Sequence, residues 1–122
     1  MSSFFAVLTG SAEVDTVLAE HVRFRSPYAD YAGRADVAHL AGLIRDLLVE
    51  VEPLQALHGD GAAMTQFEGR VAGEVVQGVV VEQHDEAGRV VDVMLTLRPY
   101  PGLRAAMAAM RERMDASPLP GA

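Results

Sequence analysis

Residues 74–98 read EVVQGVVVEQHDEAGRVVDVMLTLR, and this stretch decides the fold. Two runs rich in valine and leucine flank the tetrapeptide DEAG (residues 85–88), and the second run stops at Pro99. β-Branched runs on either side of a short turn-forming segment predict a β-hairpin with a four-residue loop. The remaining segments are expected to cover this hairpin.

The loop length predicts which residues of the hairpin face each other. His84 and Arg89 close the loop, so Glu82 is expected opposite Val91. Because side chains alternate across a strand, the pairs that continue this register share one apolar face. This face carries Val76, Gly78, Val80, Val93, Leu95 and Leu97. The opposite face is mixed, but Val79, Val81 and Met94 make it too apolar to be left in water.

The composition indicates one domain and excludes several classes of partner. A chain of 122 residues is long enough to bury a proper core. It has no cysteine, and 17 acidic against 10 basic residues give a net charge of −7. Nucleic acid and anionic membranes are bound through clustered positive charge, so neither is an expected partner. The apolar segment Phe4–Leu8 is too short for a signal peptide or a membrane span, so the cytoplasm is the expected setting.

The first third of the chain predicts a helix, a strand and a polar loop. Ser11 can cap a helix whose apolar face carries Val14, Val17, Leu18 and His21. A short strand is expected at residues 22–26, before Pro27. The loop at residues 28–33 holds two tyrosines and an aspartate, which are typical of binding groups held between fixed elements.

The remaining segments predict a long helix, two further strands and a last helix. Apolar residues recur at helical spacing from Arg34 to about Val49. Strands are expected at residues 54–58 and 63–71, and the last helix presents Leu103 together with Met107, Met110 and Met114. Residues 1–115 are therefore expected to form the single domain, and residues 116–122 a disordered tail.

This order of elements predicts an α+β domain in which a curved antiparallel sheet wraps the long helix. The segments VRFRSP (residues 22–27), AGR (32–34), DEAGRV (85–90) and LRP (97–99) resemble the nuclear transport factor 2-like (NTF2-like) superfamily. More narrowly, the chain is similar to the SnoaL-like and ketosteroid-isomerase-like proteins over residues 12–114. The resemblance implies a cystatin-like α+β cone with a pocket on the concave face, and a homodimer through the convex face at Val79, Val81 and Met94.

The catalytic residues of ketosteroid isomerases do not carry over. In those enzymes an aspartate just before the proline of the first strand takes the proton, and the resemblance puts Ser26 at that position. Their protonated aspartate falls at Val80, and their tyrosine on the first helix has no clear counterpart. We therefore keep the fold and reject this specific activity.

Glu82 and His84 are the first candidates for catalysis. The hairpin pairing places Glu82 on the apolar face, where a desolvated carboxylate can act as a general acid or base. His84 lies two residues on and could orient Glu82 or share its proton. Alternatively, Glu82, His84 and Arg89 form an ordinary polar rim where the sheet leaves the core.

The loop after the first strand holds the second group of candidates. Asp30 could act as a base and Tyr28 could donate to an oxyanion. Alternatively, Asp30 bonds to its own backbone and the tyrosines pack as lids. The residues expected to contact a ligand are Ser26, Tyr31, Val80, Val93, Leu95 and Leu97.

Two functions from different classes remain open. One is a cofactor-independent isomerase, cyclase or lyase that acts on a hydrophobic small molecule. The other is a non-catalytic dimeric module that binds a ligand or only packs. The histidines lack metal-ligand spacing and no phosphate-binding loop is present, so we expect no metal and no cofactor.

Overall fold

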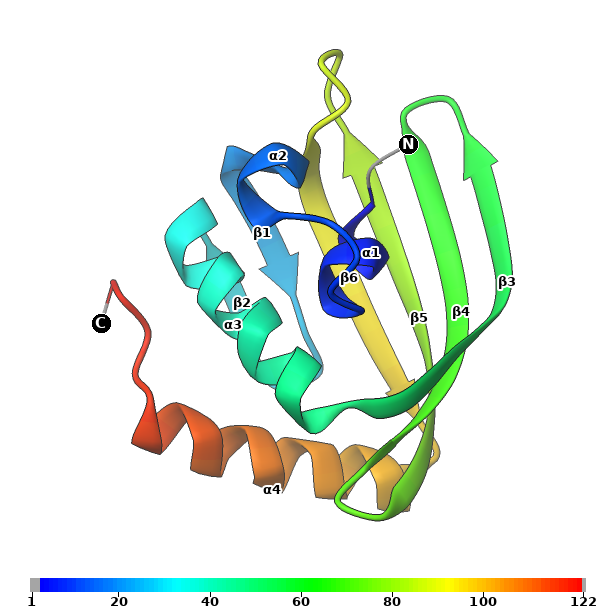
Figure 1. Cartoon of the computed structure of the whole chain (residues 1–122), viewed down its shortest axis with the longest axis vertical. Coiled ribbons are helices and arrows are strands. Elements are labelled where there is room, and N and C mark those ends of the chain that lie inside the picture. The colour runs from blue at the N-terminus through cyan, green and yellow to red at the C-terminus, as the bar shows by residue number, and fades with distance from the viewer. Residues whose placement is uncertain (1–2, 122) are drawn as a thin grey trace.

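The computed structural model describes residues 3–121, which form a curved sheet with helices on its concave side (Figure 1). The helices of this part of the chain are α1 (Phe4–Leu8), α2 (Val14–Val17), α3 (Arg34–Leu47) and α4 (Tyr100–Ala116). The strands are β1 (Leu18–Arg25), β2 (Asp30–Ala32), β3 (Val49–Gly59), β4 (Ala62–Val71), β5 (Glu74–His84) and β6 (Val90–Arg98). This arrangement is the expected α+β cone.

The six strands form one sheet in the order β2-β1-β6-β5-β4-β3. We expected an antiparallel sheet, but β1 runs parallel to β6 and the sheet is therefore mixed. A tight turn forces β5 and β6 to be antiparallel, whereas β1 comes from the other half of the chain. Its direction beside β6 is set by packing, which local sequence patterns do not report.

The hairpin β5–β6 forms as predicted, but its register was wrong by two residues. Glu82 faces Val93, and His84 faces Val90 after a register shift that leaves Val91 without a partner in the ladder. The turn is tighter than expected, because the backbone N–H of Asp85 donates to the carbonyl oxygen of Arg89 over 2.8 Å and Asp85, not His84, lies opposite Arg89. A shift of two residues keeps every side chain on its predicted face.

The helix expected to include Leu18 and His21 was wrong beyond Val17. Helix α2 stops there, and β1 begins at Leu18 with Val22 and Phe24 buried on one face. The segment expected to be a loop contains the short strand β2, which pairs with β1. Apolar residues in this region fit both a helical and an alternating pattern, and pairing with β6 selects the strand.

Strand β3 is twice as long as predicted and runs through Pro53. Proline lacks a backbone donor and is tolerated in a strand at the edge of a sheet. Here β3 is the edge strand, and its register shifts between Pro53 and Gln55. The long helix, expected to reach about Val49, ends at Leu47, so Pro53 lies inside a strand.

The core lies between the concave face of the sheet and helices α1 and α3. Phe4 of α1 packs on Phe24 of β1 with ring centroids 5.3 Å apart, and both side chains are buried. Helix α3 buries Val37, Leu40 and Ile44 of the predicted apolar stripe, together with Ala41 and Leu43. Leu47 and Val51, also expected in the stripe, are half-buried, and Val51 belongs to β3.

The C-terminal segment, expected to be a disordered tail, contacts α3. The backbone N–H of Gly121 donates to Oδ1 of Asp36 over 2.9 Å, and Nε2 of His39 lies 2.8 Å from the carbonyl oxygen of Ser117. Ala122 lies outside the described residues. Within residues 3–121, no helix is long and apolar enough to cross a membrane.

Candidate functional site

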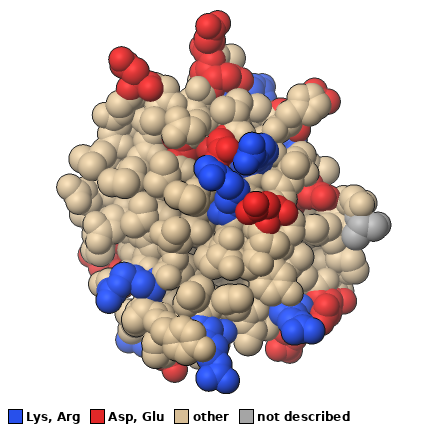
Figure 2. Space-filling model, turned by 180° about the vertical axis from the view of Figure 1, so that it is seen from behind, with Lys and Arg blue, Asp and Glu red and all other residues tan. Residues whose placement is uncertain are grey.

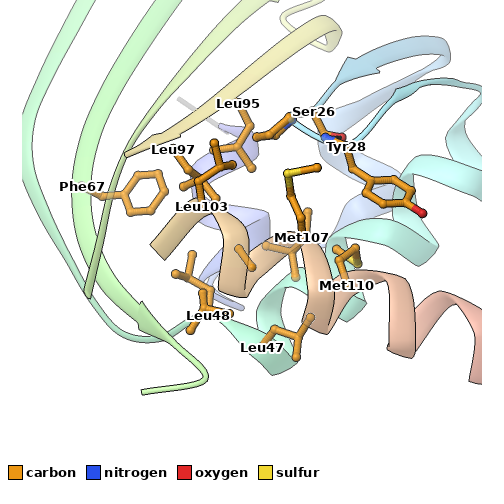
Figure 3. A pocket seen from close by; sticks show the side chains of 14 residues that line it. Ser26, Tyr28, Leu47, Leu48, Phe67, Leu95, Leu97, Leu103, Met107 and Met110 are labelled. Atoms are coloured by element: carbon orange, nitrogen blue, oxygen red, sulfur yellow. Dashed lines mark hydrogen bonds between the residues drawn. The ribbon is translucent and has the colours of Figure 1, made fainter. Parts of the chain in front are cut away.

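A pocket of about 60 Å³ lies between the concave face of the sheet, the end of α3 and helix α4 (Figure 3). Three parts of the chain enclose it: the turn after β1, strands β4 and β6, and the two helices. Its lining residues are Ser26, Pro27, Tyr28, Ile44, Leu47, Leu48, Phe67, Val71, Leu95, Leu97, Leu103, Ala106, Met107 and Met110.

The position of the Phe67 ring, which forms one wall of the pocket, depends on a glycine in β5. Gly78 pairs with Phe67 on one side and with Leu97 on the other. A Cβ atom at Gly78 would overlap the Phe67 ring and the Leu97 side chain. The missing side chain lets the Phe67 ring lie over the middle of the sheet, where it forms an apolar wall.

The lining carries no charged side chain, and its polar groups are Ser26 and Tyr28. The hydroxyl of Ser26 donates to the carbonyl oxygen of Ala29 over 2.8 Å and accepts from the backbone N–H groups of Tyr28 and Ala29. The hydroxyl of Ser26 therefore stabilises the turn after β1. Tyr28 lies at the mouth with 40% of its surface exposed, and its hydroxyl points away from the pocket in Figure 3.

Glu82 and His84 form a separate buried cluster. The side chain of Glu82 is 0% exposed, and its Oε1 lies 3.0 Å from Nε2 of His84. Both carboxylate oxygens also accept from the backbone N–H of Phe4, over 3.0 and 3.1 Å. A buried carboxylate needs such partners to offset the loss of hydration. The cluster therefore fixes the start of α1 on the sheet.

This cluster does not fit the alternative of an exposed polar rim. The side chains of Glu82 and His84 are both buried, whereas the guanidinium of Arg89 bonds to backbone carbonyl oxygens elsewhere. It donates to the carbonyl oxygen of Asp15 over 2.8 Å. Arg89 thus ties the end of the hairpin to the segment before β1.

Helix α1 separates the Glu82 cluster from the pocket. Phe4 covers Glu82, and the next residue, Phe5, packs against Phe67 with ring centroids 5.6 Å apart. Phe67 is a pocket wall, whereas neither Glu82 nor His84 lines the pocket. Glu82 and His84 therefore contact each other, but neither side chain reaches the pocket.

The remaining candidates are divided between the pocket, the core and the surface. Leu95 and Leu97 line the pocket with Ser26 and Tyr28, while Val80 and Val93 are fully buried in the core. Asp30 lies exposed in β2.

Tyr31 of β2 contacts the end of α4 instead of the pocket. Its hydroxyl donates to Sδ of Met114 over 3.7 Å. Burial, with a smaller effect of the neighbouring Tyr28, raises the pKa of Tyr31. The phenol therefore stays protonated and keeps its hydrogen to donate.

Sequence reasoning missed most of the helical lining of the pocket. Leu47 and Leu48 at the end of α3, and Met107 and Met110 of α4, were interpreted as packing residues or not singled out. The signal was present in the methionines of α4, because methionine is flexible and adapts to irregular apolar contacts. Among residues 3–121, no group of three or more histidines and carboxylates could hold a metal ion.

In sequence, the chain matches no protein-family profile and no curated protein. In structure, it is similar to a protein of Silicibacter pomeroyi described as conserved in bacteria with a cystatin-like fold. That match has a TM-score of 0.87 and 25% identity, over 96% of this chain and 89% of the other.

Two further solved structures carry functional names. A steroid delta-isomerase of Pseudomonas aeruginosa matches with a TM-score of 0.82 and 24% identity, over 93% of this chain and 84% of that one. A putative isomerase of the SnoaL-like family from Agrobacterium tumefaciens matches with a TM-score of 0.58 and 19% identity, over 79% and 92% of the two chains. The chain therefore has the cystatin-like, NTF2-like fold of these proteins, which supports the superfamily that its sequence resembles.

Proposed function

We propose that this protein binds an uncharged, apolar small molecule in the pocket under α4. The observation that carries the proposal is the lining, which is aliphatic, aromatic or methionine except for Ser26 and Tyr28. A charged ligand would lose its hydration without gaining a partner there, and that loss is costly. Small-molecule sites are commonly concave and lined by apolar side chains.

The flexible residues of α4 support a ligand of variable shape. Met107 and Met110 enter the pocket from successive turns of the helix (Figure 3). Methionine side chains rotate freely and fill irregular gaps, so they can follow the outline of different apolar molecules.

A second candidate is a cofactor-independent isomerase, cyclase or lyase, favoured by the contact between Glu82 and His84. A fully buried carboxylate beside an imidazole is a common acid–base arrangement. In this function Phe4 would have to move off Glu82, Glu82 would then take a proton from the substrate, His84 would position the carboxylate, and Tyr28 would assist at the mouth. The solved structures named as isomerases have the same fold, but a fold supports many activities.

The binding proposal is tested by titrating a neutral terpenoid alcohol into protein with isotope-labelled methionine methyl groups. Met107 and Met110 line the pocket, whereas Met64 and Met94 lie on the convex face of the sheet and act as internal references. We expect saturable shifts of the Met107 and Met110 methyl signals only. Equal shifts at all four methionines, or none, would overturn the proposal.

A pair of alanines in α4 gives a matched control for this titration. Ala106 lines the pocket, whereas Ala108 is exposed on the same helix. Ala106→Leu fills the pocket and is expected to weaken binding at least tenfold, while Ala108→Leu leaves it unchanged. Conversion of the alcohol with loss on Glu82→Gln would instead support the enzymatic candidate.

We also propose a homodimer through the convex face of the sheet. The registers of four strands place Leu57, Met64, Val81 and Met94 side by side in one row across β3, β4, β5 and β6. Leu57 is 50% exposed and Met94 36%. The view from behind shows a broad area of uncharged side chains beside a small cluster of charged ones (Figure 2). An apolar row of this kind favours a partner with the same surface.

A further inference from the structure

The pocket is too small, as it stands, for most ligands that its lining would suit. Its volume is about 60 Å³, whereas pockets for small organic ligands commonly hold 300 Å³ or more, to order of magnitude. If the proposed binding function holds, on which this inference rests, one wall of the pocket must move to admit a ligand.

Helix α4 has fewer buried residues than α3, the other helix that lines the pocket. It crosses the open end of the cone (Figure 1) and supplies Leu103, Ala106, Met107 and Met110 to the pocket. Its residues are all described, and one of them, Gly102, is fully buried. By contrast, α3 buries five residues along its length. The apolar residues of α4 pack against the core but stay partly exposed, so separating α4 from the sheet uncovers less buried surface than separating α3 would.

The first turn of α4 is fixed to the sheet. Gly102 lies against the carbonyl oxygen of Val75 and the side chain of Val76, and a Cβ atom at this position would overlap both. The close approach of the two backbones makes this end of the helix the natural pivot.

The other end of α4 is held by the bond from Tyr31 to Met114 and by the residues that follow the helix. We name residues 117–121 the strap, and Figure 1 shows this segment rising from the end of α4 beside α3. Nε2 of His39 lies 2.8 Å from the carbonyl oxygen of Ser117 and 3.1 Å from its hydroxyl. The backbone N–H of Gly121 donates to Oδ1 of Asp36 over 2.9 Å, and Leu119 packs against the core.

We propose that the strap latches α4 over the pocket, and that its release lets α4 swing about Gly102 to admit a ligand. His39 and Asp36 lie one turn apart on α3, so both anchors face the same side of that helix. Closing the latch traps the ligand under the two methionines. Opening it widens the pocket at the side where Tyr28 and Met107 meet.

The latch is tested first without any ligand, by hydrogen exchange of backbone amides. The double variant Asp36→Ala/His39→Ala removes both anchors and leaves the pocket lining intact. We expect the amides of residues 106–114 to exchange about tenfold faster, as the loss of one or two hydrogen bonds predicts. The amides of β5 and β6 should exchange at the wild-type rate. The variant Arg70→Ala, which breaks the surface pair with Glu50, is the matched control.

Binding kinetics give the second readout. With the neutral terpenoid alcohol, the double variant should both bind and release the ligand several times faster than the wild type. Unchanged exchange in α4 would overturn the latch, whether or not a ligand binds. Faster exchange in α4 together with unchanged rates of binding and release would overturn its role as the gate. A wild-type protein that binds nothing would contradict the binding function, while the exchange measurement would still decide whether the strap holds α4.

Discussion

At the scale of single residues, Glu82 is notable because its carboxylate is fully buried. Its removal by Glu82→Ala leaves the Phe4 N–H and the His84 ring without an acceptor in a buried place. We expect this change to lower the free energy of unfolding by about 3 kcal/mol. Glu82→Gln keeps the shape and one acceptor oxygen, so about 1 kcal/mol is expected. Urea unfolding measures both values.

Glu20→Ala, at an exposed position of β1, is the control for this pair of variants. A loss of less than about 0.5 kcal/mol for Glu82→Ala, in the range of ordinary surface changes, would contradict the structural role of the carboxylate. The acid–base role would then be its better explanation.

The sequence predicted on which face of the sheet each of these residues lies, but not at what depth. Alternation placed Glu82, Val80, Val93, Leu95 and Leu97 on the apolar face, and the structure confirms that face. Which of them line the pocket depends on where α1 and α4 cross the sheet. The contact between Phe4 and Glu82 spans 78 residues, and no local pattern encodes it.

At the scale of elements, the turn between β5 and β6 determines the hairpin register. Oδ1 of Asp85 accepts from the backbone N–H groups of Ala87 and Arg89 over 3.0 and 2.9 Å. Asp85→Ala removes both bonds, and we expect it to lower the free energy of unfolding by about 1 kcal/mol. Glu86→Ala, exposed in the same turn, should change it by less than about 0.5 kcal/mol. Thermal or urea unfolding of the two variants compares them directly. Equal effects would show that the carboxylate of Asp85 does not hold the turn.

The same turn explains why the predicted register was wrong although the predicted faces were right. The bond from Asp85 to Arg89 closes the turn at Asp85 instead of His84 and so shifts the pairing by one residue, and the unpaired Val91 shifts it by a second. A shift of one residue would move every side chain to the opposite face of the sheet, but a shift of two returns each side chain to its predicted face. The pattern of apolar residues predicts the faces of the strands, but it does not predict the hydrogen bonds that the carboxylate of Asp85 makes in the turn.

At the scale of the whole molecule, the cone could be predicted because its helices and strands each have a local sequence pattern. One long amphipathic helix and several alternating strands suffice to predict helices packed on one side of a sheet. The strand order and the parallel pair β1–β6 could not be predicted, because they join segments about 70 residues apart. The strap was interpreted as a disordered tail because it contains two prolines. Its bonds are to His39 and Asp36 of α3, which are about 80 residues away in the sequence and could not be inferred from the composition of the tail.

The convex face supports the last prediction, which concerns assembly. A stable homodimer buries about 800 Å² on each partner, about one eighth of the 6747 Å² that the chain exposes. The row from Leu57 to Met94 spans four strands of that face, and a charge placed there would be desolvated in the dimer. We therefore expect the wild type to sediment as a dimer at micromolar concentration and Met94→Arg to sediment as a monomer.

Ala35→Arg, exposed on α3 at the helical side of the molecule, adds the same charge away from the row and should leave the dimer intact. Sedimentation velocity of the three proteins over a range of concentrations separates the outcomes. A monomeric wild type would refute the dimer, and a dimer that persists in Met94→Arg would move the interface away from this face. Since the pocket opens on the opposite side of the sheet, neither result would alter the expected binding of an apolar ligand under α4.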